Sequence, residues 1–271
     1  MLKSKILNFN SPHPSQMPAV PPETSPKQIP KNLGGSAPPQ PICVPLRNWR
    51  INLHNQASQI SLFKSQSSST LVPVAHTPFH ELLQSDLAKL EKNLRDLIDP
   101  HLETKDHLSL LNLACGRADE TGVLAKVLAE KSKSAHIQGL DIRAPEIGQA
   151  NSRWKKELEE KTSSDFIVHR GDRLLDLQEV GTPDIAFLRH QNYWNDKPVW
   201  TAIFDQALER LNEEGLLVIT SYFDKEHALA SKALEQLGAI QVGSIVNPNS
   251  RTLIDAPGKS VDKHLAVFKK G

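Results

Sequence analysis

The chain of 271 residues carries 32 basic and 31 acidic side chains, and its formal net charge of +1 produces no strong electrostatic field. Charge therefore implies neither nucleic acid nor another polyanion as a partner. Its two cysteines, Cys43 and Cys115, cannot build a disulfide framework or a four-thiolate zinc site. No apolar run approaches the roughly 20 residues that span a bilayer. We expect a cytoplasmic protein that is not inserted in a membrane and needs no metal.

Residues 1–73 have the composition of a disordered tail. Eleven of the nineteen prolines lie within residues 11–45, and a serine-rich run without periodicity occupies residues 58–70. Such a segment has too few large apolar side chains to compensate for the entropy lost on ordering. A protein partner could bind the tail through Trp49 and Ile51; the alternative is a spacer with an isolated apolar cluster.

Residues 74–106 are expected to flank the main domain with one amphipathic helix over about residues 78–99. Thr77 and Pro78 are typical of a helix start, and Pro100 ends the pattern. Between them the apolar residues recur at steps of three and four, so that they share one helix face: Phe79, Leu82, Leu83, Leu87, Leu90, Leu94, Leu97 and Ile98.

Residues 107–271 alternate between strand and helix patterns, which predicts an α/β domain. The expected strands are residues 108–113, 137–142, 166–169, 184–188, 216–222, 240–246 and 264–268. The last two have no helix between them and should form a terminal antiparallel β-hairpin. The fold class is therefore a doubly wound, mostly parallel seven-stranded sheet, preceded by the helix and the disordered tail. Such sheets bind ligands beyond the carboxyl ends of their strands.

The loop after the first strand contains small residues, which let a backbone approach a ligand closely. Ala114, Gly116 and Ala118 alternate there, and glycine can adopt dihedral angles closed to other residues. A tight strand-to-helix turn needs small residues with or without a ligand, so this loop alone leaves both readings open. Cys115 is interpreted as a small buried filler rather than a nucleophile.

Acidic residues follow the second and third strands. Asp141 lies about 25 residues beyond the first loop, close to the offset at which a carboxylate binds a ribose diol. Asp172 could accept a hydrogen bond from the amine of an adenine, or could instead cap a turn. A small-residue loop followed by these two acids predicts a nucleoside ligand.

Charge discriminates between nucleoside cofactors. A dinucleotide fold offers a bare helix N-terminus to its diphosphate, but here that place holds Asp119 and Glu120. S-adenosylmethionine has no phosphate and carries an ammonium and a sulfonium cation, so the acids favour it. Helix capping is the alternative role for both acids.

From about residue 108 to residue 270 the sequence resembles the class I methyltransferase family. Residues 111–118 are similar to that family's first motif, although only Gly116 is retained, with alanines at the outer glycine positions and Asn112 at the usual acid. Asp141 matches the ribose-binding acid, and Gly171 with Asp172 matches the adenine-contacting pair. The resemblance implies S-adenosylmethionine as cofactor, bound by ten residues: Asn112, Ala114, Cys115, Gly116, Asp119, Asp141, Ile142, Asp172, Arg173 and Arg189.

The end of the fourth strand is where this family places residues that face the methyl acceptor. His190 is the candidate general base, and Tyr193 or Trp194 could stack on a flat acceptor; closing the upper edge of the sheet is the alternative role for all three. Arg189 could also steer an acidic substrate. The family's Asn-Pro-Pro-aromatic sequence for base amines is missing here, and the acceptor, a small molecule or a macromolecule, stays open.

Two other functions are compatible with the sequence. One is a non-catalytic nucleoside-binding or scaffold protein whose proline-rich tail recruits partners. The other is an NAD-dependent oxidoreductase. A melting temperature that rises with NAD and not with S-adenosylmethionine would identify it.

Overall fold

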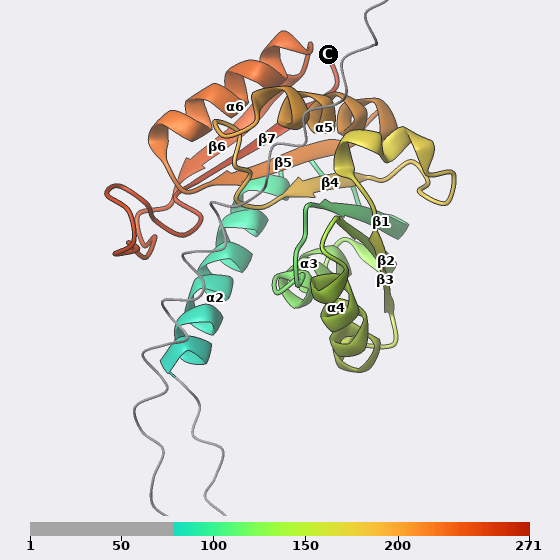
Figure 1. Ribbon diagram of the computed structural model, residues 1–271. Coiled ribbons are helices and arrows are strands. Elements are labelled where there is room, and N and C mark those ends of the chain that lie inside the picture. Colours follow the sequence, from blue (N-terminus) through green and yellow to red (C-terminus); the bar gives the residue numbers. More distant parts are fainter. Residues whose placement is uncertain (1–77) are drawn as a thin grey trace, which may run out of the picture. The chain divides into compact units, whose positions relative to one another are not determined.

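The computed structural model describes residues 78–271, so the predictions for the tail, Trp49 and Ile51 included, lie outside the described residues. Seven strands form one sheet in the order β3-β2-β1-β4-β5-β7-β6 (Figure 1). The first five are parallel, and β7 runs antiparallel to both β5 and β6, which confirms the predicted fold class. The strands are β1 (Lys105–Leu113), β2 (Ser132–Asp141), β3 (Thr162–Val168), β4 (Ile185–Leu188), β5 (Leu216–Ser221), β6 (Ile240–Val246) and β7 (His264–Lys269).

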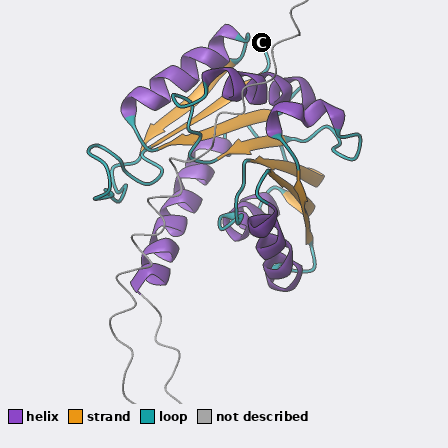
Figure 2. Cartoon of the chain, viewed as in Figure 1, coloured by secondary structure: helices purple, strands orange, loops and turns teal. Residues whose placement is uncertain are grey.

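Helices cover both faces of the sheet. In Figure 1 one side carries α2, α3 and α4, and the other carries α5 and α6; Figure 2 shows the same layers by type of structure. A short 3₁₀ helix, η1, replaces a full helix between β3 and β4. The bounds are α2 (Pro78–Ile98), α3 (Thr121–Ala129), α4 (Ala144–Glu157), η1 (Gly171–Asp176), α5 (Lys197–Arg210) and α6 (Asp224–Gln236). In the part of the chain that the structure describes, none of these helices has the length and apolarity needed to cross a membrane.

The central strands are apolar on both sides because they are buried on both sides. In β5, Leu216 and Val218 pack into the core beneath α2 and α3, whereas Leu217 and Ile219 pack into the core beneath α5 and α6. A strand covered on both faces needs no polar alternation, which explains the continuous apolar runs that predicted these strands.

The predicted helix at the start of the domain is confirmed, but only part of its apolar face is buried. Leu90 and Leu94 are fully buried against the sheet, whereas Phe79 and Leu82 in the first turns are exposed. The helix approaches β6 so closely that a Cβ added to Gly243 would lie 2.9 Å from the Leu97 side chain. Glycine on β6 therefore permits this packing.

Three strands begin earlier than predicted, β1 at Lys105 instead of residue 108, β2 at Ser132 instead of residue 137 and β3 at Thr162 instead of residue 166. Over residues 134–138, β2 alternates buried apolar residues with partly exposed polar ones, such as His136. The His136 ring contacts Asp165 of β3 at 2.7 Å, so polar pairs replace the apolar contacts on that face. A search for continuous apolar runs misses such half-exposed strands.

Candidate functional site

The turn after β1 holds the backbone conformation that glycine favours. Ala114, Gly116 and Ala118 have φ angles of 55°, 56° and 51°, in the left-handed region. An alanine in that region costs roughly 1–2 kcal/mol, so the surrounding structure has to hold the turn. The Trp154 indole N–H donates to the Ala118 carbonyl at 2.9 Å, and the Gly116 N–H donates to an Asp141 carboxylate oxygen at 2.8 Å. The turn therefore keeps the shape of a glycine-rich loop although two of its small residues are alanines.

Asp141 ends β2 and is buried beside this turn. Its Oδ1 accepts hydrogen bonds from the backbone N–H and the Nε of Arg143, both at 2.9 Å. Its Oδ2 accepts from the Gly116 N–H and from Arg143 Nη2 at 3.1 Å. Burial by itself would raise the pKa of Asp141, but the Arg143 hydrogen bonds and charge hold that pKa below its usual value. Asp141 is therefore ionised and fully hydrogen-bonded.

Two further strand-end acids are also paired with an arginine two positions away in the sequence. Arg170 donates from Nε and Nη2 to the two oxygens of Asp172, at 2.9 and 2.6 Å. The Asp119 carboxylate accepts a hydrogen bond from Arg117 at 3.1 Å and another from Arg153 of α4 at 2.6 Å. The arginine partners in these pairs were not predicted from the sequence, although the spacing of Arg and Asp two residues apart is visible there.

A hollow of about 520 Å³ opens beside the ends of β2 and β3. Two of the predicted cofactor residues, Ile142 and Arg173, line it, and Ile142 is 61% exposed. Arg173 pairs loosely with Asp176 at 3.7 Å. The hollow is lined by Ile142, Val168, His169, Arg170, Arg173 and Asp176.

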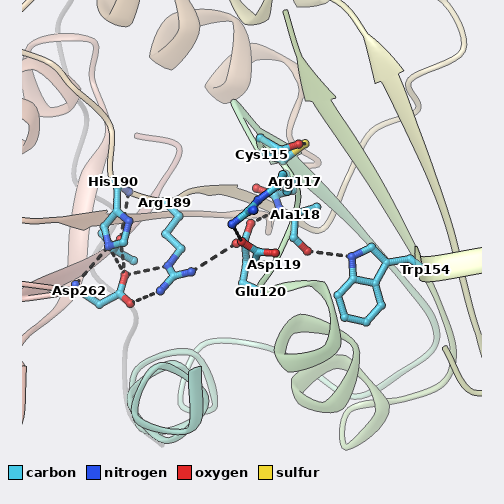
Figure 3. Close-up of polar contacts among 12 residues, drawn as sticks. Cys115, Arg117, Ala118, Asp119, Glu120, Trp154, Arg189, His190 and Asp262 are labelled. Atoms are coloured by element: carbon cyan, nitrogen blue, oxygen red, sulfur yellow. Dashed lines mark hydrogen bonds and ion pairs between the residues drawn. The ribbon is translucent and has the colours of Figure 1, made fainter. Parts of the chain in front are cut away.

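A buried charge network links the end of β4 to the start of α3 and to Asp262, two residues before β7 (Figure 3). Arg189 donates to both oxygens of Asp262, at 3.0 and 2.6 Å, and reaches Glu120 at 3.4 Å. Glu120 also accepts a hydrogen bond from the Asn112 amide at 2.6 Å. Glu120 is the N-cap residue of α3, yet its side chain caps no helix N–H. The contacts of the Glu120 side chain lie in this network instead. The sequence pointed to Glu120 as an acid at the helix start but not to its contact with Arg189, and it did not point to Asp262 at all.

His190 lies on the edge of the same network. Its Nε2 is 2.8 Å from Asp262 Oδ1 and 3.2 Å from the Asp262 backbone nitrogen. A neutral ring with its proton on Nε2 donates to the carboxylate, whereas a ring with its proton on Nδ1 accepts the backbone N–H at Nε2. Its ring stacks on Tyr222 at a centroid distance of 3.8 Å. Burial lowers the pKa of His190 despite the nearby Asp262 carboxylate, so the imidazole is neutral at pH 7. His190 and Asp262 both have positive φ angles, 57° and 46°.

The aromatic residues after β4 and the cysteine of the turn are buried to different degrees. The Tyr193 ring packs on Phe204 at 5.7 Å and its hydroxyl contacts Thr201 at 3.2 Å, so Tyr193 belongs to the core. Trp194 packs against Phe223 and is only partly buried. Cys115 is buried, and desolvation raises the pKa of its thiol well above the usual value, as expected for a filler rather than a nucleophile.

Among residues 78–271, no group of three histidine, cysteine or acidic side chains is arranged to hold a metal ion. The structure places the ten predicted cofactor residues in three groups at one edge of the sheet. Asn112, Ala114, Cys115, Gly116, Asp119 and Asp141 form the turn or lie beside it. Ile142 and Arg173 line the hollow, and Asp172 is bound to Arg170 of its lining. Arg189 lies in the buried network with His190.

Comparison with known proteins rests on the fold. No protein-family model matches the chain, and no curated protein matches its sequence. Many solved methyltransferase structures match the structure. An S-adenosylmethionine-dependent methyltransferase from Clostridium acetobutylicum ATCC 824 is 11% identical, with a TM-score of 0.52 over 81% of this chain and 100% of that one. The magnesium protoporphyrin IX methyltransferase of Synechocystis PCC 6803, solved with bound S-adenosylmethionine, is 14% identical, with a TM-score of 0.50 over 75% of this chain and 87% of that one. The fold is that of the class I S-adenosylmethionine-dependent methyltransferases.

Proposed function

We propose that the chain is an S-adenosylmethionine-dependent methyltransferase that acts on an acceptor still to be identified. The observation that carries this proposal is the Asp141 carboxylate, buried at the carboxyl end of β2 and hydrogen-bonded to the N–H of Gly116. An acid in this position of a doubly wound sheet is suited to the two hydroxyls of a ribose.

The surrounding residues fit a nucleoside. The left-handed turn at Gly116 brings the backbone of the β1–α3 loop close to Asp141. The exposed side chain of Ile142 offers an apolar surface to a base, at the hollow near Asp172. A hollow of about 520 Å³ falls within the range of small-molecule sites.

The start of α3 argues against a dinucleotide. A diphosphate binds to free N–H groups at a helix N-terminus, whereas here the carboxylates of Asp119 and Glu120 lie at that place. Arginine partners neutralise much of their charge, but the helix N-terminus is still not bare. S-adenosylmethionine carries a sulfonium and an ammonium against one carboxylate, so its net charge is positive and these acids do not repel it as they would a diphosphate.

Methyl transfer from a sulfonium is an in-line displacement, for which a protein supplies proximity, alignment and, for a protonated acceptor, a base. His190 is the candidate base. Asp262 holds it through Nε2, and Nδ1 has no hydrogen-bond partner among the described residues. In the tautomer whose Nε2–H donates to Asp262 Oδ1, the neutral imidazole can take the acceptor's proton at Nδ1, and the Asp262 carboxylate can stabilise the imidazolium that forms.

Isothermal titration of the full chain with S-adenosylmethionine, its demethylated product and NAD tests the proposal. We expect saturable binding of the two sulfur nucleosides and no binding of NAD. If only NAD binds and raises the melting temperature, the oxidoreductase function replaces the proposal.

A second candidate is a nucleoside-binding protein without transferase activity. The specific observation in its favour is that the strand-end acids Asp119, Asp141 and Asp172 are already paired with arginines. Binding of S-adenosylmethionine without turnover of any acceptor in a broad panel would support this second function.

A further inference from the structure

The Arg143 side chain lies where a ribose would have to lie. Its Nε donates to Asp141 Oδ1 at 2.9 Å and its Nη2 donates to Asp141 Oδ2 at 3.1 Å. Arg143 therefore gives one side-chain hydrogen bond to each carboxylate oxygen. Two neighbouring ribose hydroxyls that bind one carboxylate need the same arrangement of two donors.

The other acceptor positions of Asp141 are already filled by the backbone. The Gly116 N–H binds Oδ2 at 2.8 Å, and the backbone N–H of Arg143 binds Oδ1 at 2.9 Å. A carboxylate has about four acceptor sites. The two sites that a diol could use are therefore the two that the Arg143 guanidinium occupies.

The guanidinium also lies against the backbone of the turn. A Cβ added to Gly116 would be only 2.6 Å from Arg143 Nη2. Glycine at such a position allows another group to approach the main chain closely. In this structure the group that approaches Gly116 is Arg143. Arg170 binds both oxygens of Asp172 and Arg117 binds one oxygen of Asp119, but among the described residues neither guanidinium lies against a glycine as Arg143 does.

The third nitrogen of the Arg143 guanidinium already contacts a second acid. Glu146, in the first turn of α4, lies 3.3 Å from Arg143 Nη1. The Arg143 side chain is 32% exposed, so that it can leave Asp141 towards solvent without disturbing the core.

We infer that Arg143 is a built-in competitor that occupies the ribose position of Asp141 and has to turn away, towards Glu146, before a nucleoside binds. The inference rests on the proposed function, because it takes the ligand to be a nucleoside with a free ribose diol. Arg143 sets the affinity of the site: the apparent affinity is the intrinsic affinity multiplied by the fraction of molecules in which Asp141 is free.

The test is the affinity of the full-length Arg143→Met variant for S-adenosylmethionine and for its demethylated product, measured by isothermal titration. Methionine keeps an apolar stem of similar length and removes the guanidinium. We expect a Kd about tenfold lower than that of the wild type, the factor that applies if Asp141 is free in one molecule of ten. The backbone N–H groups that hold Asp141 are unaffected by this change.

Arg251→Met is the matched control. Arg251 is also 32% exposed and also binds a buried aspartate, Asp86, through Nε and Nη2. This pair joins the loop between β6 and β7 to α2. Its removal likewise leaves a buried carboxylate without its arginine. The Kd for the nucleosides should stay at the wild-type value.

If the wild type binds and Arg143→Met binds equally or more weakly, the inference is overturned while the proposed function stands. If neither protein binds a nucleoside, the proposed function fails and the inference fails with it. Should Arg143→Met not fold, Arg143→Lys decides. Lysine keeps the charge but lacks the fork that binds both oxygens of Asp141, so the Kd should fall below the wild-type value, and an unchanged or higher Kd overturns the inference.

Discussion

The two halves of the site use ion pairs of different kinds. In the half at the ends of β1, β2 and β3, which we call the cofactor half, Asp141 and Asp172 pair with arginines two residues away that are 32% and 62% exposed. The acceptor half is formed by the ends of β4 and β5 and by Asp262, two residues before β7. There Arg189 is only 11% exposed and pairs with Asp262, 73 positions along the chain.

This difference indicates which pairs a ligand can displace. The arginines of the cofactor half are partly exposed, so that their charge can turn to water when a ligand with its own hydrogen bonds takes their place at the carboxylate. Removing one partner of a buried pair leaves an uncompensated charge and costs about 3–5 kcal/mol. We therefore expect the cofactor half to exchange partners during function and the acceptor half to keep its arrangement.

The largest expected effect concerns His190, at the edge of the acceptor half. His190→Gln should lower turnover about 100- to 10,000-fold, the usual contribution of a positioned base. The Kd for S-adenosylmethionine should stay near the wild-type value, because His190 contacts Asp262 and Tyr222 rather than the turn at Gly116.

The same assay gives a pH profile once an acceptor is known. Burial lowers the pKa of His190, so the wild-type rate should fall only as the pH drops below the ordinary histidine range. Turnover of His190→Gln at the wild-type rate would leave His190 with a structural role at the edge of the sheet.

Asp262→Asn should cause the largest loss of stability, about 3–5 kcal/mol in the free energy of unfolding measured with urea at pH 7. Asparagine tolerates the positive φ of this position, so that the change removes the charge without straining the backbone. Asp96→Asn, in an exposed pair with Lys92 on α2, is the control and should change stability by no more than about 0.5 kcal/mol.

The loss should also depend on pH. Burial alone would raise the pKa of Asp262, but the charges of Arg189 and His190 hold that pKa far below its usual value. The stabilisation is therefore present above about pH 4 and is lost as the pH falls further. A difference between wild type and variant that is as large at pH 2 as at pH 7 would contradict this origin.

In the cofactor half, Asp141→Ala should weaken S-adenosylmethionine binding by about 1–3 kcal/mol, the contribution of charge-assisted hydrogen bonds. Titration calorimetry measures the change. Asp165→Ala is the control, because Asp165 also pairs with a side chain of the sheet, His136, but lies on β3 before the strand ends. Equal affinities for wild type and Asp141→Ala would show that Asp141 does not bind the cofactor.

Glu226, in the first turn of α6 after β5 of the acceptor half, is a buried acid without an arginine partner among the described residues. Burial raises its pKa to about 7 from 4.5 even though the N–H groups of Tyr222 and Tyr193 bind it, and one carboxylate oxygen has no partner among the described residues. Between pH 4.5 and 7 the folded chain retains a proton that the unfolded chain has released. Stability contributed by this group therefore falls as the pH rises through that window.

Glu226→Gln should consequently raise the free energy of unfolding by roughly 1–3 kcal/mol at pH 8 and leave it almost unchanged at pH 4.5. Thermal unfolding at the two pH values measures the difference. Glu213→Gln, at a position that is 94% exposed, is the control and should show no such pH dependence. A lower stability of Glu226→Gln at pH 8 would show that the ionised carboxylate is required in the acceptor half.

Much of the fold could be predicted because its signals are local in the sequence. The buried strands are continuous apolar runs, and α2 shows apolar residues at helical spacing from Leu87 to Ile98. The half-exposed beginnings of β2 and β3 were missed because their stability comes from pairs between strands, such as His136 with Asp165. Partners on a neighbouring strand leave no periodic signal in either segment.

For the site, the sequence by itself determined which residues gather at one edge of the sheet. In a parallel sheet the carboxyl end of each strand lies at the same edge, so Gly116, Asp141 and His190 come together whatever their separation along the chain. It also determined that acids rather than a bare N-terminus begin α3, because Asp119 and Glu120 directly precede that helix.

Only the tertiary structure decided how the charges are paired. Arg189 could have faced solvent or substrate; it is buried between Asp262 and Glu120 because β7 is inserted antiparallel beside β5 and brings Asp262 to the end of β4. Likewise, the turn at Gly116 folds back on Asp141 and leaves its two remaining acceptor positions to Arg143. Side-chain pairing depends on distances in space and on burial, and a linear pattern of residues contains neither.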